Sequence, residues 1–165
     1  MTTSFEQRLT EAVALREAGD YDEAREMLLD LHAEQPDHAE VNLQCAWVHD
    51  KLGLETLALP FYERAIARGL SDEDLRDALL GLGSTYRALG HYEQALATLT
   101  RGVEEYPGDN PMAVFRALAL HNSGRGKEAC EILLRLLIAT TADESIIGYR
   151  NALEEYAADL DRIWP

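Results

Sequence analysis

A short phrase that occurs four times constrains this 165-residue chain more than any other feature. Each copy joins the end of one amphipathic stretch to the start of the next through a glycine, a polar turn and an alanine. The copies occupy residues 16–24, 50–58, 87–95 and 121–129, and their glycines are Gly19, Gly53, Gly90 and Gly124. Helix–turn–helix units repeated about every 34 residues predict a solenoid, in which each unit packs on its neighbours.

On both sides of each phrase the apolar residues recur three or four positions apart, which is typical of a helix that buries one face. Leu75, Leu79, Leu82 and Tyr86 show this spacing between the second and third phrases. The pattern predicts helices at residues 3–18, 21–34, 37–52, 54–68, 72–89, 92–106, 111–123, 127–139 and 143–161.

Helix ends can be assigned from local signals. Asp20, Ser71 and either Asp109 or Asn110 stand where N-caps are wanted, because their side-chain oxygens can accept hydrogen bonds from the first free backbone amides. Pro60 removes one backbone donor and should bend its helix unless it falls in the first turn.

Composition excludes several classes of protein. Hydrophobic residues make up 47% of the chain, enough for a continuous core. The net charge of −15 argues against binding to nucleic acid, which requires a positive field. It predicts either a well-solvated surface or a basic partner.

The chain has no uncharged apolar run near the roughly 18 residues that a membrane span needs. Its N-terminus lacks the basic and apolar regions of a secretory signal. Cys45 and Cys130 are far apart and form no disulfide framework, as in proteins of a reducing compartment. We therefore expect a cytoplasmic protein with no membrane partner.

The four units resemble the tetratricopeptide repeat family, most closely in the third unit. The matching residues there are Leu79, Leu82, Gly83, Tyr86, Gly90, Tyr92, Ala95, Leu99, Gly102 and Pro107. The second and fourth units depart from the pattern. His49 takes a tyrosine place and Cys45 a leucine place in the second, and Arg116 and Thr141 depart from it in the fourth.

This resemblance implies an all-α, right-handed superhelical solenoid of four repeats and a C-terminal capping helix, about nine helices in total. The expected repeats occupy about 5–38, 39–72, 76–109 and 110–143, within a repeat region of 1–141. Residues 142–165 form the capping helix and tail. The whole chain is similar to small stand-alone bacterial members of the family that carry an extra C-terminal helix.

The resemblance also implies which residues line the concave groove, because three places of each unit face it in this family. They are Leu9, Val13, Arg16, Leu43, Trp47, Asp50, Leu80, Ser84, Arg87, Val114, Leu118 and His121. Trp47 either anchors a partner or packs under a neighbouring helix. Arg16 and Arg87 pair either with partner carboxylates or with acids of this chain. The Lys, Asn and Arg clamp of chaperone-cofactor members is absent.

No constellation typical of catalysis or of metal binding is found in the sequence. Cys45 and His49 lie four apart on one predicted helix, but two ligands are too few for a metal site. The GLGST segment at 81–85 falls inside a predicted helix and lacks the lysine of a phosphate-binding loop. We expect no enzyme activity, cofactor or metal.

The favoured hypothesis is an adaptor or scaffold whose concave groove binds a peptide or helix of another protein. One alternative is a structural protein that dimerises through its C-terminal helix and Trp164. Another is a small acidic chaperone for an exported protein.

Overall fold

The computed structural model describes residues 4–164, and within that range it contains ten helices and no strand. They are α1 (Phe5–Ala18), α2 (Tyr21–Glu34), α3 (Ala39–Lys51), α4 (Glu55–Arg68), α5 (Asp72–Ala88), α6 (Tyr92–Glu105), α7 (Asn110–Asn122), α8 (Gly126–Thr140), α9 (Glu144–Ile147) and α10 (Arg150–Ala158). The first eight agree with the predicted ranges to within two residues at each end; the predicted start at residue 3 lies outside the described residues.

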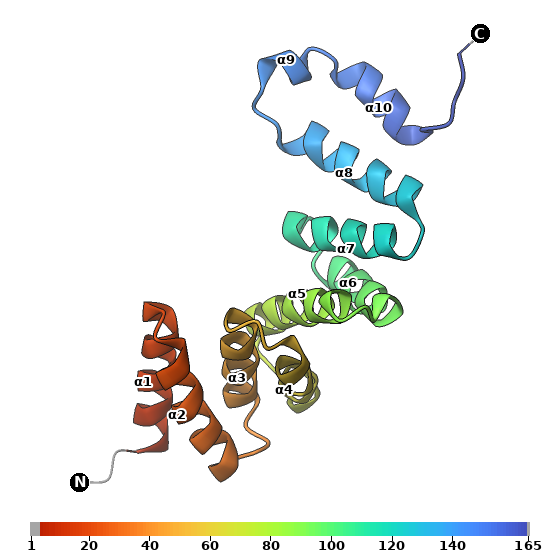
Figure 1. Ribbon diagram of the computed structural model, residues 1–165. Coiled ribbons are helices and arrows are strands. Elements are labelled where there is room, and N and C mark those ends of the chain that lie inside the picture. The colour runs from red at the N-terminus through yellow and green to blue at the C-terminus, as the bar shows by residue number, and fades with distance from the viewer. Residues whose placement is uncertain (1–3, 165) are drawn as a thin grey trace.

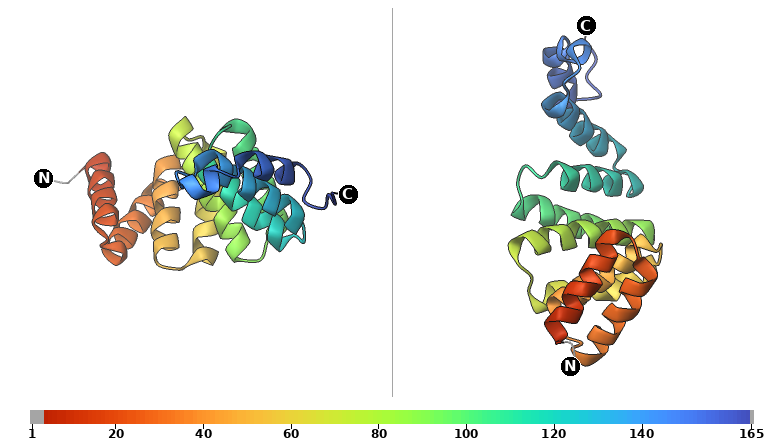
Figure 2. Two further views of the ribbon diagram at one scale, coloured as in Figure 1. Left: turned by 90° about the horizontal axis from the view of Figure 1, so that it is seen from above. Right: turned by 90° about the vertical axis from the view of Figure 1, so that its left-hand side faces the viewer.

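Helices α1 to α8 form four antiparallel pairs that stack from one end of the molecule to the other (Figure 1). The described N- and C-terminal parts therefore lie at opposite ends of an elongated body (Figure 2). The core is divided in the same way. Three clusters each join one helix pair to the first helix of the next pair, and a fourth lies between α7 and α8. This arrangement is the predicted solenoid.

The glycines of the recurring phrase end the first helix of each pair, because each adopts a left-handed backbone with φ between 69° and 95°. Ser71 and Asp109 cap the next helices as predicted, through the amides of Asp74 and Met112. Asp20 is the N-cap residue of α2 as predicted, but the expected side-chain hydrogen bond is absent. Its carbonyl accepts from Ala24.

Glycines inside the helices allow the units to approach closely. A Cβ on Gly83 would lie within 3.0 Å of the Leu99 side chain, and one on Gly102 would overlap Met112 in the same way. Leu99 and Met112 are fully buried and have no room to move away.

The single C-terminal helix predicted over 143–161 is wrong, because the structure has α9 and α10 in its place. The break falls at Gly148 and Tyr149, where glycine supports a helix poorly and the backbone of Tyr149 departs from helical angles. The break turns α10 back along α8 (Figure 1).

Three contacts hold α10 on α8. Ala157 is fully buried, and its carbonyl accepts a hydrogen bond of 3.0 Å from Arg135. Lys127 at the start of α8 binds Asp159 and Asp161 at 3.3 and 2.8 Å. Helix α4 is uninterrupted. It runs through Pro60, which lies beyond the first turn.

Candidate functional site

A pocket of about 330 Å³ opens on the first helices of the second, third and fourth pairs. Its lining residues come from α3, α5 and α7, and no residue of α4 or α6 takes part: Trp47, Asp50, Asp77, Leu80, Gly81, Ser84 and Phe115. We call this the central pocket. Four predicted groove residues, Trp47, Asp50, Leu80 and Ser84, are thus brought together from two units, and Phe115 of a third unit lies beside them.

Trp47 is half-buried and forms one wall of the central pocket. The guanidinium carbon of Arg16 lies 5.1 Å from the centre of its ring, within the range of a cation–π contact. Arg16 also donates to Gln44 at 2.7 Å and forms an ion pair with Glu17 at 3.3 Å. The predicted groove residue Arg16 is therefore already held by side chains of its own chain.

Arg87 is held in a similar way, because it donates to the Asn122 side-chain oxygen at 3.3 Å. That partner is a neutral amide from α7, so the bond joins two neighbouring units without neutralising the arginine. Neither Arg87 nor Arg16 lines the central pocket.

Asp50 is the carboxylate at the centre of a hydrogen-bond network. The Tyr62 hydroxyl donates to it at 2.6 Å and the Thr85 hydroxyl at 3.2 Å. Burial raises the pKa of Asp50 above its usual 3.8, although both hydrogen bonds oppose that rise. Gly81 makes room for the network, because a Cβ there would overlap the Tyr62 ring.

Asp77 accepts a 2.8 Å hydrogen bond from Arg76, the residue before it. Arg76 also binds Asp109, whose other oxygen caps α7 through the Met112 amide. One guanidinium is therefore shared by two carboxylates, and this group carries a net negative charge at neutral pH.

The prediction that Leu9 and Leu43 line the groove is wrong. Leu9 is only 3% exposed and Leu43 is fully buried. Leu9 packs in the first core cluster and Leu43 in the second. Val13 and Val114 are half-buried and line neither the central pocket nor the second pocket described below.

The sequence reasoning missed Asp77 and Phe115, which line the central pocket, and Tyr62, which supports it. Asp77 precedes Leu80 by three positions and so shares its helix face, a signal that the sequence contains. Phe115 follows Val114 directly, so the family pattern points to a different face of the same helix.

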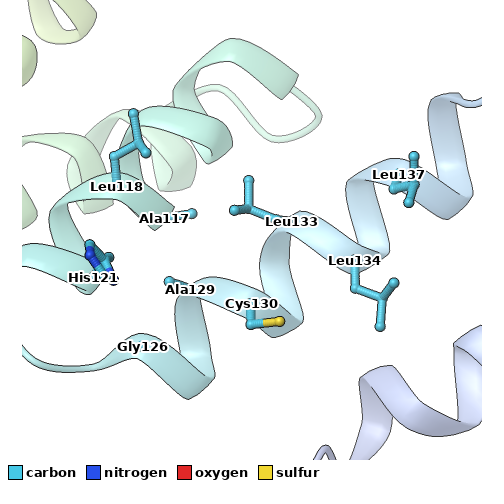
Figure 3. A pocket seen from close by; sticks show the side chains of 9 residues that line it. All are labelled: Ala117, Leu118, His121, Gly126, Ala129, Cys130, Leu133, Leu134 and Leu137. Carbon is cyan, nitrogen blue, oxygen red and sulfur yellow. The ribbon is translucent and has the colours of Figure 1, made fainter.

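A second pocket, of about 390 Å³, lies between α7 and α8 (Figure 3). Its lining is apolar apart from His121 and Cys130, and it includes the predicted groove residue Leu118. Leu118, Leu133 and Leu137 are exposed large hydrophobic residues in this pocket. We call it the C-terminal pocket.

The two cysteines differ in environment. Cys130 is exposed in the C-terminal pocket, whereas burial of the Cys45 thiol raises its pKa to about 12. His49 is 3% exposed, its Nδ1 lies 2.7 Å from the Cys45 carbonyl oxygen, and its ring stacks on Phe61. Cys45 and His49 are thus core residues.

Over residues 4–164 the structure places no three His, Cys, Asp or Glu side chains where they could hold a metal ion together. In the same range, each helix is too short or too polar to cross a membrane.

Two families of known proteins match stretches of this chain. Residues 39–160 match the family described as Tetratrico peptide repeat, and residues 7–30 match a second one described as Tetratricopeptide repeat. This chain belongs to the tetratricopeptide repeat family. No curated protein sequence is similar enough to count as a relative.

Solved structures of three other proteins share the fold. MamA from Desulfovibrio magneticus is 20% identical, with a TM-score of 0.72 over 81% of this chain and 74% of that one. YrrB, described as a TPR protein with an unusual peptide-binding site, is 18% identical, with a TM-score of 0.73 over 94% and 78%. An O-GlcNAc transferase from Thermobaculum terrenum is 22% identical, with a TM-score of 0.68 over 83% of this chain and 27% of that one.

Proposed function

We propose that this tetratricopeptide protein is an adaptor that binds an extended or helical segment of a partner protein in the central pocket. One observation carries the proposal: two aromatic side chains from different units, Trp47 and Phe115, line an open pocket on the first helices of successive pairs. The description of YrrB as having a peptide-binding site supports the same use of this fold.

The pocket has the features of a binding hot spot. Trp47 offers a large apolar surface with little conformational freedom to lose, and Leu80 extends that surface on α5. The network of Asp50, Tyr62 and Thr85 fixes the polar part of the pocket before a partner arrives. A partner segment would gain binding energy by burying an apolar side chain in such a pocket, and the polar groups would fix the position of the segment along the groove.

The test measures binding of the labelled full chain to an array of short random peptides. Trp47→Ala combined with Leu80→Glu should weaken the binding of every selected peptide by about 30-fold or more, as expected for loss of a binding hot spot. The matched control is Tyr92→Ala combined with Leu57→Glu, which changes exposed residues on α6 and α4. Equal binding by both double variants would refute the proposal.

A second candidate function is self-association through the C-terminal third. Seven large hydrophobic side chains are exposed there, in the C-terminal pocket and beyond it: Leu118, Leu133, Leu137, Tyr149, Tyr156, Ile163 and Trp164. Ile163 is 91% exposed and Trp164 is 47% exposed, so the tail of one copy offers apolar groups to the pocket of another.

Light scattering at several concentrations tests this candidate. A dimer that Leu133→Lys dissociates, while Leu57→Lys leaves it intact, would support self-association at this end of the molecule. A strict monomer at every concentration would exclude it.

A further inference from the structure

The central pocket is negatively charged without a matching cation. It contains two carboxylates, Asp50 and Asp77, and in the described part of the chain no lysine or arginine lines it. Asp50 is partly buried, and its two hydrogen-bond donors are neutral hydroxyl groups. A carboxylate that leaves water without a cation loses hydration that hydroxyl groups replace only in part.

The basic residues near the pocket do not supply the missing charge. Arg76 is divided between Asp77 and Asp109. Arg16 lies 5.1 Å from the centre of the Trp47 ring, but it is bound to Gln44 and Glu17 and does not line the pocket. Glu55 adds negative charge near Asp50 and raises its pKa further. The electrostatic field in the pocket is therefore negative and favours binding of a positively charged group, in a chain whose net charge is −15.

The walls of the pocket suit a particular kind of cation. Trp47 and Phe115 are aromatic, and aromatic faces attract ammonium and guanidinium groups while packing against their aliphatic stems. A volume of about 330 Å³ holds on the order of ten waters at about 30 Å³ each, room enough for one long side chain. Ser84 adds a hydroxyl group to the same lining.

We infer that the central pocket binds a lysine or arginine side chain of the partner segment, with Asp50 and Asp77 as its counter-ions and Trp47 and Phe115 as its walls. This inference rests on the proposed function and names the chemistry that the site selects. An extended or helical peptide would place one basic residue in the pocket and apolar residues along Leu80. Peptides with a glutamate at that place would be rejected, because like charges meet in a partly dehydrated site.

The experiment uses peptides selected on the random array and remeasured in solution. In a Trp164→Phe background, Trp47 is the only tryptophan and its fluorescence reports occupancy of the central pocket. Each selected peptide is compared with versions in which a single lysine becomes norleucine or a single arginine becomes citrulline, changes that remove the charge and keep most of the stem.

We expect one such neutral replacement in each peptide to weaken binding about tenfold or more in the parent protein. The same replacement should have a much smaller effect in Asp50→Asn and Asp77→Asn, because the counter-ion is already lost. Glu104→Gln on the exposed part of α6 removes the same charge outside the pocket and should keep the full tenfold effect.

The possible failures can be told apart. Peptides that bind and depend on Trp47 and Leu80, but tolerate every neutral replacement, would overturn this inference and leave the proposed function intact. The inference would also be overturned if a neutral replacement weakened peptide binding as much in both Asp→Asn variants as in the parent protein. Peptides that bind independently of Trp47 and Leu80 would overturn both.

Discussion

The Asp50 carboxylate accepts hydrogen bonds from Tyr62 and Thr85, and among residues 4–164 no basic side chain lines the pocket beside it. Its pKa is raised because burial outweighs those bonds, so its ionisation costs folding free energy. At the residue scale, the group proposed to recognise a cation is therefore one that the free protein keeps at the expense of its own stability.

Asp50→Asn should raise the urea midpoint at pH 7. The pKa of Asp50 in the folded protein is raised above 3.8. The protonated carboxyl group therefore stabilises the fold below that pH, and this contribution to the free energy of unfolding is lost as the pH rises through the pKa of the folded protein. Asparagine does not ionise and can still accept from Tyr62. The difference between variant and parent should therefore be larger at pH 7 than at pH 4.

Glu104→Gln is the control for that measurement, because it removes the same charge from an exposed place on α6. A lower midpoint for Asp50→Asn at pH 7 would mean that the ionised carboxylate is a net stabilising group.

The packing glycines give a second prediction at this scale. Gly83→Ala should destabilise the protein by about 2 kcal/mol, because the clash with the fully buried Leu99 costs about 3 kcal/mol and helix propensity returns about 1 kcal/mol. Gly126→Ala has open space around it in α8 and should be neutral or stabilising by up to about 1 kcal/mol. Thermal unfolding of both variants checks the contrast, and a Gly83→Ala protein as stable as the parent would contradict it.

At the element scale, α10 differs from the helix that would begin a further unit. Helices α3, α5 and α7 each share a core cluster with the pair before them, whereas no residue of α10 belongs to the cluster between α7 and α8. Ala157, Arg135 and Lys127 hold it on α8 instead. This incomplete cover explains why Leu118, Leu133 and Leu137 remain exposed in the C-terminal pocket.

Ala157→Glu should detach α10 while the helix pairs stay folded, because it forces a charge into a fully buried place. Proteolysis within residues 142–149 should become about tenfold faster or more, since local opening controls cleavage. Ala158→Glu is the matched control, because Ala158 is the exposed neighbour on the same helix. Equal cleavage rates in the two variants would show that α10 is not held through Ala157.

The helices could be predicted from the sequence because their signals are local: an apolar period, a left-handed glycine and a capping hydroxyl or carboxylate. The break at Gly148 and Tyr149 could not, because Gly148 keeps a right-handed backbone and only the packing of α10 on α8 reveals the turn. The site was partly predictable. Trp47 and Leu80 can be found by aligning the repeats. The burial of Leu43 and the place of Phe115 in the pocket depend on how deeply each unit is covered by the next, which alignment does not give.

At the scale of the whole molecule, the core becomes smaller along the chain. The four clusters contain eight, seven, five and three buried residues in order, counted over the residues that the structure describes. In a solenoid, stability is roughly a sum over units and their interfaces, so this gradient predicts that the C-terminal units open more readily than the N-terminal ones.

Hydrogen exchange followed by mass spectrometry measures that gradient. Amides of α3, where eight of the thirteen residues are buried, should be the most protected, and those of α8 and α10 should exchange first. We expect exchange rates to differ about tenfold for each difference of about 1.4 kcal/mol in local stability, as the opening equilibrium requires. Equal protection in α3 and α8 would mean that the chain opens as one cooperative body.

The division of the core into unequal clusters also gives the molecule a mechanical direction. A degradation machine that pulls on the C-terminal end meets the smallest cluster first, and each pair it removes leaves a shorter stack whose remaining clusters are intact. The same machine pulling from the N-terminal end must first break the largest cluster, which α1, α2 and α3 build together. Tags placed at the two ends should therefore give different lifetimes under the same machine, with the N-terminally tagged protein surviving longer.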